Sequence, residues 1–173
     1  MSAKRLTWGT TAGISYILSI FLANWLIAHF GLVPVGFGLM APAGVFVAGA
    51  AFALRDVIQD TLGLGWVLVA IVLGTLASML VSPHFALASG SAFLFSEISD
   101  FAVYTPLRRR SWIAAAVVSN TVGDVVDSIL FLLLAFGSTD NLLGLMVGKW
   151  YVTIPVVAWW GVKRSREEKE WQS

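Results

Sequence analysis

The chain has 173 residues, of which 58% are hydrophobic and only 12% are charged, and its net charge is +1. A soluble domain of this length would expose far more charge, and a net charge near zero gives no basic field for nucleic acid. The absence of cysteine excludes disulfides, thiolate metal sites and cysteine nucleophiles, and the two histidines, predicted at helix ends, do not form a metal cluster. We therefore expect neither a metal nor a cofactor.

Six apolar segments follow one another along the chain, each close to the roughly 20 residues that a bilayer requires. They cover residues 8–30, 33–54, 64–81, 85–104, 112–136 and 142–160. The first is too long for the apolar core of a signal peptide, so we expect it to remain as a span. The turns are short, which makes neighbouring helices antiparallel. The sequence thus predicts one domain over residues 1–173, an all-α integral membrane protein folded as a bundle of six transmembrane helices.

The basic residues predict the orientation of these spans, because cytoplasmic loops carry an excess of Lys and Arg. Those on one side are Lys4, Arg5, Arg55, Arg108, Arg109, Arg110, Lys163, Arg164, Arg166 and Lys169. The opposite loops, near residues 31, 82 and 138–141, contain none. Asp56 and Asp60 follow Arg55 and are interpreted as solvated residues at the cytoplasmic end of the second segment. We expect a multi-pass protein of the cell inner membrane with both termini in the cytoplasm.

Glycine and proline make the second segment irregular, at Gly36, Gly38, Pro42, Gly44 and Gly49. Irregular backbone at membrane depth is tolerated only where it is buried in protein or lines a cavity. Residues 42–44 are therefore either a packing kink or part of the wall of a pocket. Elsewhere, Gly9 and Gly13, and likewise Gly144 and Gly148, have the small-xxx-small spacing that favours tight packing within the bundle.

Ionisable side chains lie inside the predicted spans, where each costs at least about 2.5–3.5 kcal/mol at the centre of a bilayer. They are Glu97, Asp100, Asp124, Asp127 and Lys149. Asp127 and Lys149 lie at similar depths below the same face of the membrane, so we expect them to form an ion pair. Glu97 and Asp100 have i, i+3 spacing and share one face of their helix.

Two asparagines extend this polar set. Asn120, Asp124 and Asp127 follow i, i+4, i+7 spacing and form one stripe, and Asn24 in the first span can join them. These side chains either satisfy one another as structural hydrogen bonds and ion pairs or line a polar pocket for a solute. Because four carboxylates face one lysine, the surplus acids are either protonated or in contact with water or a ligand.

Several short motifs occur in a fixed order along the predicted spans. They are PAG at 42–44, DVIQDTLG at 56–63, SEISD at 96–100, PLR at 106–108, SNTVG at 119–123 and DS at 127–128. In this order the chain resembles the putative vitamin uptake transporter family, whose best-known members are queuosine precursor transporters. Each motif alone is weak, and the ordered set is fairly specific.

The resemblance implies a carrier similar to the substrate-binding components of energy-coupling-factor (ECF) vitamin transporters. It implies import of 7-cyano-7-deazaguanine (preQ0) or a related deazapurine base. By motif position it carries over Asp56, Glu97, Asp100, Asn120 and Asp127. The chain departs from the pattern at Asp60, where glutamate is expected, and at Asp124, where glutamine is common.

The chemistry of such a base suits the polar residues of the spans. A guanine-like edge presents an N–H and an NH₂ side by side, and a carboxylate accepts both in a bidentate pair. Glu97, supported by Asp100 and Asn120, is the side chain that we expect to bind this edge. Lys149 or Asn24 would donate to the ring carbonyl or the nitrile. The aromatic side chains available to stack on the ring are Phe93, Phe95 and Trp150.

Other functions remain open at this stage. The chain is alternatively a substrate-binding subunit for another vitamin, which would need an energising partner, since no phosphate-binding loop for ATP is present. An intramembrane enzyme could use the paired carboxylates as acid and base, but no metal cluster or nucleophile set supports it, and we expect no enzyme. A purely structural role is disfavoured by the buried charges. The expected partners are the lipid bilayer and a small-molecule substrate, with a homo-oligomer also open.

Overall fold

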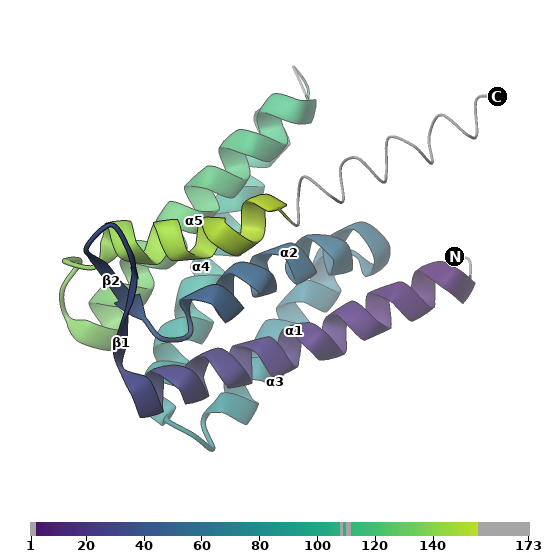
Figure 1. Cartoon of the computed structure of the whole chain (residues 1–173). Coiled ribbons are helices and arrows are strands. Elements are labelled where there is room, and N and C mark those ends of the chain that lie inside the picture. The colour runs from purple at the N-terminus through teal and green to yellow at the C-terminus, as the bar shows by residue number, and fades with distance from the viewer. Residues whose placement is uncertain (1–2, 108, 110–111, 156–173) are drawn as a thin grey trace.

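The computed structural model describes residues 3–107, 109 and 112–155. Helix α1 (Ala3–Phe30) is followed by strands β1 (Leu32–Gly36) and β2 (Leu39–Pro42), and then by α2 (Val45–Leu62) and α3 (Leu64–Ser78). Helices α4 (Pro83–Leu107) and α5 (Trp112–Phe136) come next, and a last apolar helix is described over Leu142–Pro155. The helices form a bundle with the two strands at one end (Figure 1). Residues 156–160 of the last predicted span lie outside the described residues.

Five of the six predicted segments coincide with helices whose ends are shifted by a few residues, and the second one is wrong over residues 33–42. Those residues form an antiparallel hairpin, with Val33 opposite Ala41, instead of the start of a helix. The turn needs positive φ values at Gly36 (96°), Phe37 (54°) and Gly38 (74°), and glycine adopts this conformation without strain. The two prolines that bracket the turn further disfavour a helix. The predicted all-α fold is thus correct apart from this hairpin.

Two hydrophobic clusters hold the bundle together. The first joins α1 through α4 and includes Tyr16, Phe52, Ile58 and Phe93. The second joins the hairpin, α4, α5 and the last helix, and its centre includes Leu132. Among the labelled elements, α4 packs most extensively on α5 and α1 on α2. Asn24, Asp127 and Lys149 lie beside residues of both clusters.

Close helix packing fixes the position of the last helix. A Cβ placed on Gly144 would overlap the backbone oxygen of Met40, and one on Gly148 would lie 2.5 Å from the side chain of Val45. Gly9 is similarly close to Leu62 on α2. The predicted tight packing is confirmed at these three glycines, whereas a Cβ on Gly13 would meet no atom within 4 Å.

The outside of the bundle is apolar and its inside is partly charged. Exposed side chains include Ile14 (56%), Leu18 (60%) and Val72 (55%), while charged groups such as Lys149 are buried. This inverts the usual distribution of a soluble protein. Among the described helices, Leu6–Phe30 and Val117–Phe136 are long and apolar enough to cross a membrane. These features are those of a membrane protein, and the number of spans remains a prediction.

Candidate functional site

Lys149 lies at the centre of a buried group of polar side chains. Its Nζ donates to Asp127 Oδ2 at 2.6 Å, to Asp124 Oδ1 at 2.9 Å and to Ser128 Oγ at 2.7 Å. Trp150 Nε1 donates to the other oxygen of Asp124 at 2.9 Å. We call these five residues the lysine cluster. The predicted ion pair of Asp127 and Lys149 is confirmed, and all three donors of the ammonium group have an acceptor.

Arg55 lies at the centre of a second group, on the cytoplasmic side predicted from the sequence. Its Nη1 donates to Glu97 Oε1 at 2.7 Å and its Nη2 to Asn120 Oδ1 at 2.6 Å. Nε and Nη2 both donate to Asp56 Oδ1, at 3.0 and 2.7 Å. We call these four residues the arginine cluster. The arginine is 3% exposed, whereas the side chain of Asp56 is 38% exposed and reaches solvent.

The interpretation of Arg55 as a loop residue is therefore wrong, because it lies within α2 and points into the bundle. The spacing of apolar residues along the sequence indicates that Arg55 lies on the buried face of its helix. Phe52 and Ile58, three residues to either side, are both buried core residues, and side chains three apart lie on one helix face. Reading the second segment as ending at residue 54 hid this periodicity.

One aromatic ring connects the two clusters. The centroid of the Phe52 ring lies 5.3 Å from the guanidinium carbon of Arg55 and 4.9 Å from Lys149 Nζ. Both distances allow a cation–π interaction. Phe52 also contacts Phe93 edge to face, at 5.9 Å between centroids. The cations thus lie on the same aromatic group, so a shift of this ring would affect both.

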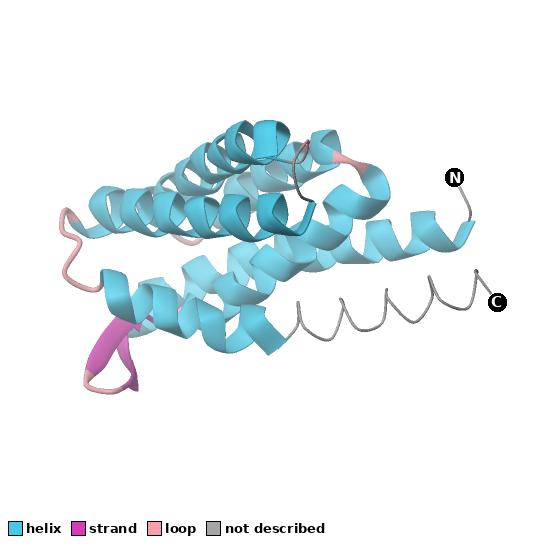
Figure 2. Cartoon of the chain, turned by 90° about the horizontal axis from the view of Figure 1, so that it is seen from above, coloured by secondary structure: helices cyan, strands magenta, loops and turns pink. Residues whose placement is uncertain are grey.

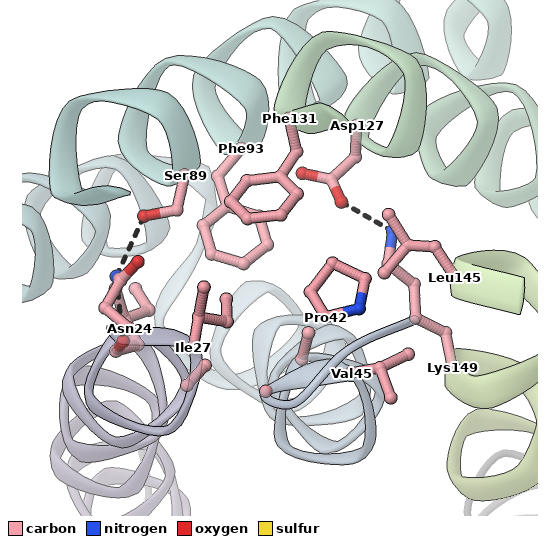
Figure 3. A pocket seen from close by; sticks show the side chains of 14 residues that line it. Asn24, Ile27, Pro42, Val45, Ser89, Phe93, Asp127, Phe131, Leu145 and Lys149 are labelled. Carbon is pink, nitrogen blue, oxygen red and sulfur yellow. Dashed lines mark hydrogen bonds and ion pairs between the residues drawn. The ribbon is translucent and has the colours of Figure 1, made fainter. Parts of the chain in front are cut away.

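A cavity lies beside the lysine cluster (Figure 3). Its walls come from α1, from the end of β2 and the start of α2 with the link between them, and from α4, α5 and the last helix. Pro42 and Gly44 line it, which confirms that the 42–44 segment forms part of a pocket wall. The volume is about 30 Å³, enough for about two water molecules. Most of the lining is apolar, and its polar side chains are Asn24, Ser89, Asp127 and Lys149.

The polar groups of the cavity face each other across it. In Figure 3, Asn24 and Ser89 lie at one side, Asp127 and Lys149 at the other, and the rings of Phe93 and Phe131 between them. Asn24 Nδ2 donates to Ser89 Oγ at 2.9 Å and to the Ile20 carbonyl at 3.0 Å. Because the Ile20 carbonyl oxygen can only accept a hydrogen bond, the Asn24 atom that faces it must be the amide nitrogen, and this assigns the orientation of the amide. The side chain oxygen of Asn24 is buried and has no partner among the described residues.

The structure brings together only some of the predicted site residues. Asn24, Asp127 and Lys149 line the cavity. Those that do not are Glu97 and Asn120, which bind Arg55, Asp124, which binds Lys149, and Asp100. Of the predicted stacking residues, Phe93 lines the cavity, Phe95 is 54% exposed and Trp150 is 41% exposed. In the described part of the chain, no group of His, Cys, Asp or Glu has the arrangement to hold a metal ion.

Comparison with known proteins points in the same direction as the sequence motifs. Residues 79–159 match the family model described as Putative vitamin uptake transporter. The resemblance is confirmed over that part of the chain. It covers α4, α5 and the last helix, and so includes the predicted site residues from Glu97 to Lys149. The description names uptake, not catalysis. No curated protein and no solved structure matches the chain.

Proposed function

We propose that the protein is a membrane transporter that imports a purine-like base, preQ0 or a related deazapurine, across the cell inner membrane. The family match to vitamin uptake transporters supports transport. The apolar outer surface and the charged interior support a carrier with a polar path through its centre. The cavity between Asn24 and the lysine cluster is the observation on which the substrate proposal rests.

In this proposal the base lies flat between the two polar sides of the cavity. Its N–H and NH₂ donors bind the carboxylate of Asp127, and Lys149 turns one of its three N–H donors from a present acceptor to the ring carbonyl. The unpartnered oxygen of Asn24 accepts the N–H of the five-membered ring. The rings of Phe93 and Phe131 provide the apolar faces against which an aromatic base packs.

The predicted role of Glu97 takes a different form in this arrangement. Glu97 and Asn120 hold Arg55, and Asp124 holds Lys149, so they position the charged groups around the cavity. Direct binding of the base by Glu97, supported by Asp100 and Asn120, requires Arg55 to move away. Substitutions of Asp127 and Glu97 distinguish binding of the base by Asp127 from binding by Glu97.

The size of the cavity implies that the helices move during transport. A space for about two waters is smaller than a purine ring, so the walls must separate before a base enters. Such movement is expected, since carriers expose a central site to each side of the membrane in turn. The hairpin and the last helix are the elements that we propose to move, because the hairpin lies at one end of the bundle next to the last helix (Figures 1 and 2) and both contribute residues to the cavity.

The test is growth and uptake in cells that cannot make deazaguanine. Expression of this chain should allow them to use a low external concentration of preQ0, and labelled preQ0 should enter the cells. Asp140→Asn, in the exposed loop before the last helix, is the control and should transport normally. Failure of purified protein in proteoliposomes to transport any deazapurine would reject the proposal. Transport in cells but not in proteoliposomes would indicate the alternative, a binding subunit that needs an energising partner.

We also propose that all six helices cross the membrane and that both termini are cytoplasmic. The charge distribution along the sequence supports this orientation. Reporter proteins fused at Ser138 and after Ser173 should report opposite sides of the membrane. Agreement between the two reporters would contradict the six-span arrangement.

A further inference from the structure

Asp100 on α4 is buried beside the arginine cluster without being held by it. Its side chain is 6% exposed, and Oδ1 has no hydrogen-bond partner among the described residues. It packs against α5, where a Cβ on Gly123 would lie 3.6 Å from the Cβ of Asp100. A buried carboxylate oxygen without a hydrogen-bond donor is unfavourable, so this group needs a further partner.

Arg55 is close enough to interact with Asp100 but is already engaged. Arg55 and Glu97 both lie within electrostatic range of Asp100. The guanidinium donates all its described hydrogen bonds to Asp56, Glu97 and Asn120. One cation therefore serves the carboxylates of Asp56, Glu97 and Asp100. One added positive charge at Asp100 would reduce this excess of negative charge and give its free oxygen a partner.

In the lysine cluster, the cation serves fewer carboxylates than Arg55 does. There, one ammonium group is shared by two carboxylates, Asp124 and Asp127, and every donor of Lys149 has an acceptor. Both oxygens of Asp124 are also bound, one of them by Trp150. Among the described residues, the one carboxylate oxygen that is fully buried without a hydrogen-bond partner belongs to Asp100.

We propose that Asp100 is the site of a proton that crosses the membrane together with the substrate, so that a proton gradient drives uptake. The coupling rests on the proposed function in one respect, that a base is transported. A proton from the outer side binds Oδ1 of the Asp100 carboxylate and is released to the cytoplasm when the base is released. The net reaction moves one proton and one base inward.

A proton fits this position better than a metal cation. A sodium ion needs several oxygen ligands arranged around it, whereas the site offers one free carboxylate oxygen. Ser96, one turn before Asp100, donates its hydroxyl to the Gly123 carbonyl and so binds elsewhere. Acidic residues in membrane helices commonly carry protons in transporters.

The neighbours of Asp100 provide a route for release toward the cytoplasm. Among the described residues, the charged groups that interact with it or with its neighbours are Glu97 on α4 and Arg55 and Asp56 on α2. Tyr104 follows Asp100 by one helical turn on α4, and α5 contributes the amide of Asn120, which binds Arg55. The arginine cluster runs from buried Glu97 to Asp56, which is 38% exposed. Asp56 is the member of this cluster that reaches solvent, so a proton that leaves Asp100 past Arg55, which keeps its own protons, is released there.

The test uses the purified full chain in proteoliposomes and labelled preQ0. With the lumen one pH unit more alkaline than the bath, the wild type should accumulate preQ0 up to about tenfold, the limit for one proton per neutral base. A sodium gradient alone should give no accumulation. Exchange of labelled for unlabelled preQ0 without any gradient reports transport itself. Exchange without accumulation in the wild type would overturn the coupling and leave the proposed function standing, while the absence of both would reject the proposed function.

Substitution of Asp100 then locates the proton. Asp100→Asn should lose accumulation, with an inside-to-outside ratio of about one, and should keep exchange. Asp100→Glu, which keeps a carboxyl group, should restore part of the accumulation. Accumulation by Asp100→Asn equal to that of the wild type would overturn the assignment.

A measurement without substrate covers the case in which Asp100→Asn fails in both assays. The infrared carbonyl stretch of a protonated carboxyl group, followed against pH, should be present in the wild type and reduced in Asp100→Asn. The same substitution at Asp140, in the exposed loop, should leave the buried band unchanged. An identical band in the wild type and in Asp100→Asn would overturn the proposal.

Discussion

The lysine cluster and the arginine cluster are both buried ion-pair networks, and they differ in how completely they are satisfied. Lys149 has three acceptors for three donors and lies deep in the bundle beside the cavity. Arg55 shares its charge with Asp56, which reaches solvent, and leaves Asp100 with a free oxygen. A closed network holds a fixed geometry, which suits binding of a ligand. A network with an unpaired carboxylate oxygen can gain or lose a charge at low cost, which suits the coupling of proton movement to transport.

Removal of the lysine should have the largest effect. Lys149→Ala leaves Asp124 and Asp127 buried without their cation, and breaking a buried pair in this way costs about 3–5 kcal/mol. We expect a large fall in the thermal unfolding midpoint in detergent and loss of uptake.

A second substitution tests whether the unpaired charge is the cause. Adding Asp127→Asn to Lys149→Ala removes one of the two stranded carboxylates and should recover part of the lost stability. If the double variant unfolds as early as Lys149→Ala, the loss comes from the missing side-chain packing and the ion pair contributes little.

Substitution of one carboxylate in each cluster separates the two positions proposed for base recognition. In Asp127→Asn an amide N–H₂ faces the donors of the base, which should cost about 2–4 kcal/mol, or roughly 30- to 1000-fold in affinity. Glu97→Gln should cost less than about tenfold, because Glu97 binds Arg55 and does not line the cavity. The measurement is the preQ0 concentration for half-maximal uptake in variants expressed at equal levels.

A larger effect of Glu97→Gln than of Asp127→Asn would favour the role of Glu97 that the sequence predicts. If Glu97→Gln weakens uptake more than Asp127→Asn, the guanine-like edge is bound at the arginine cluster, and Arg55 moves when the base enters.

Loss of the arginine should be less severe than loss of the lysine. Arg55→Ala strands Glu97 and Asn120, but Asp56 is hydrated, so we expect about 2–3 kcal/mol of destabilisation. Arg55→Lys keeps the charge and loses the fork that contacts three partners, so it should recover only part of the stability. Equal unfolding midpoints for Arg55→Ala and Lys149→Ala would show that solvent contact at Asp56 does not reduce the contribution of the arginine cluster to stability.

The sequence predicted the Asp127–Lys149 pair of the lysine cluster and missed the arginine cluster for a physical reason. Asp127 and Lys149 interrupt long apolar runs, so their burial and their depth follow from position alone. Arg55 lies near a predicted helix end, where a basic residue normally marks the cytoplasmic face. Its burial depends on where α2 begins and ends, and the hairpin of residues 32–42 moved both limits.

Depth along a helix also does not determine which buried side chains share a cavity. Asn24, Asp127 and Glu97 all lie inside the predicted spans, yet Asn24 and Asp127 line one cavity whereas Glu97 binds Arg55. Rotation of each helix about its axis decides this, and packing between helices sets the rotation. By contrast, the number and order of the predicted helices follow from the lengths of the apolar segments alone, and the rotation of each helix is not needed to predict them.

The smallest expected effect concerns the backbone that supports the lysine cluster. A Cβ on Gly49 would lie 2.6 Å from the backbone oxygen of Lys149, so α2 and the last helix approach each other closely at the cluster itself. Gly49→Ala should push them apart and destabilise the protein by about 1–3 kcal/mol, partly offset by the better helix propensity of alanine.

Gly65→Ala in α3 is the matched control, because a Cβ there meets no atom within 4 Å. It should be neutral or stabilise by up to about 1 kcal/mol. Thermal unfolding in detergent measures both, and uptake adds a second readout. Displacement of Lys149 by Gly49→Ala should also weaken preQ0 uptake. Full stability and normal uptake in Gly49→Ala would mean that the two helices separate freely at this point, and that the geometry of the lysine cluster does not depend on their close contact.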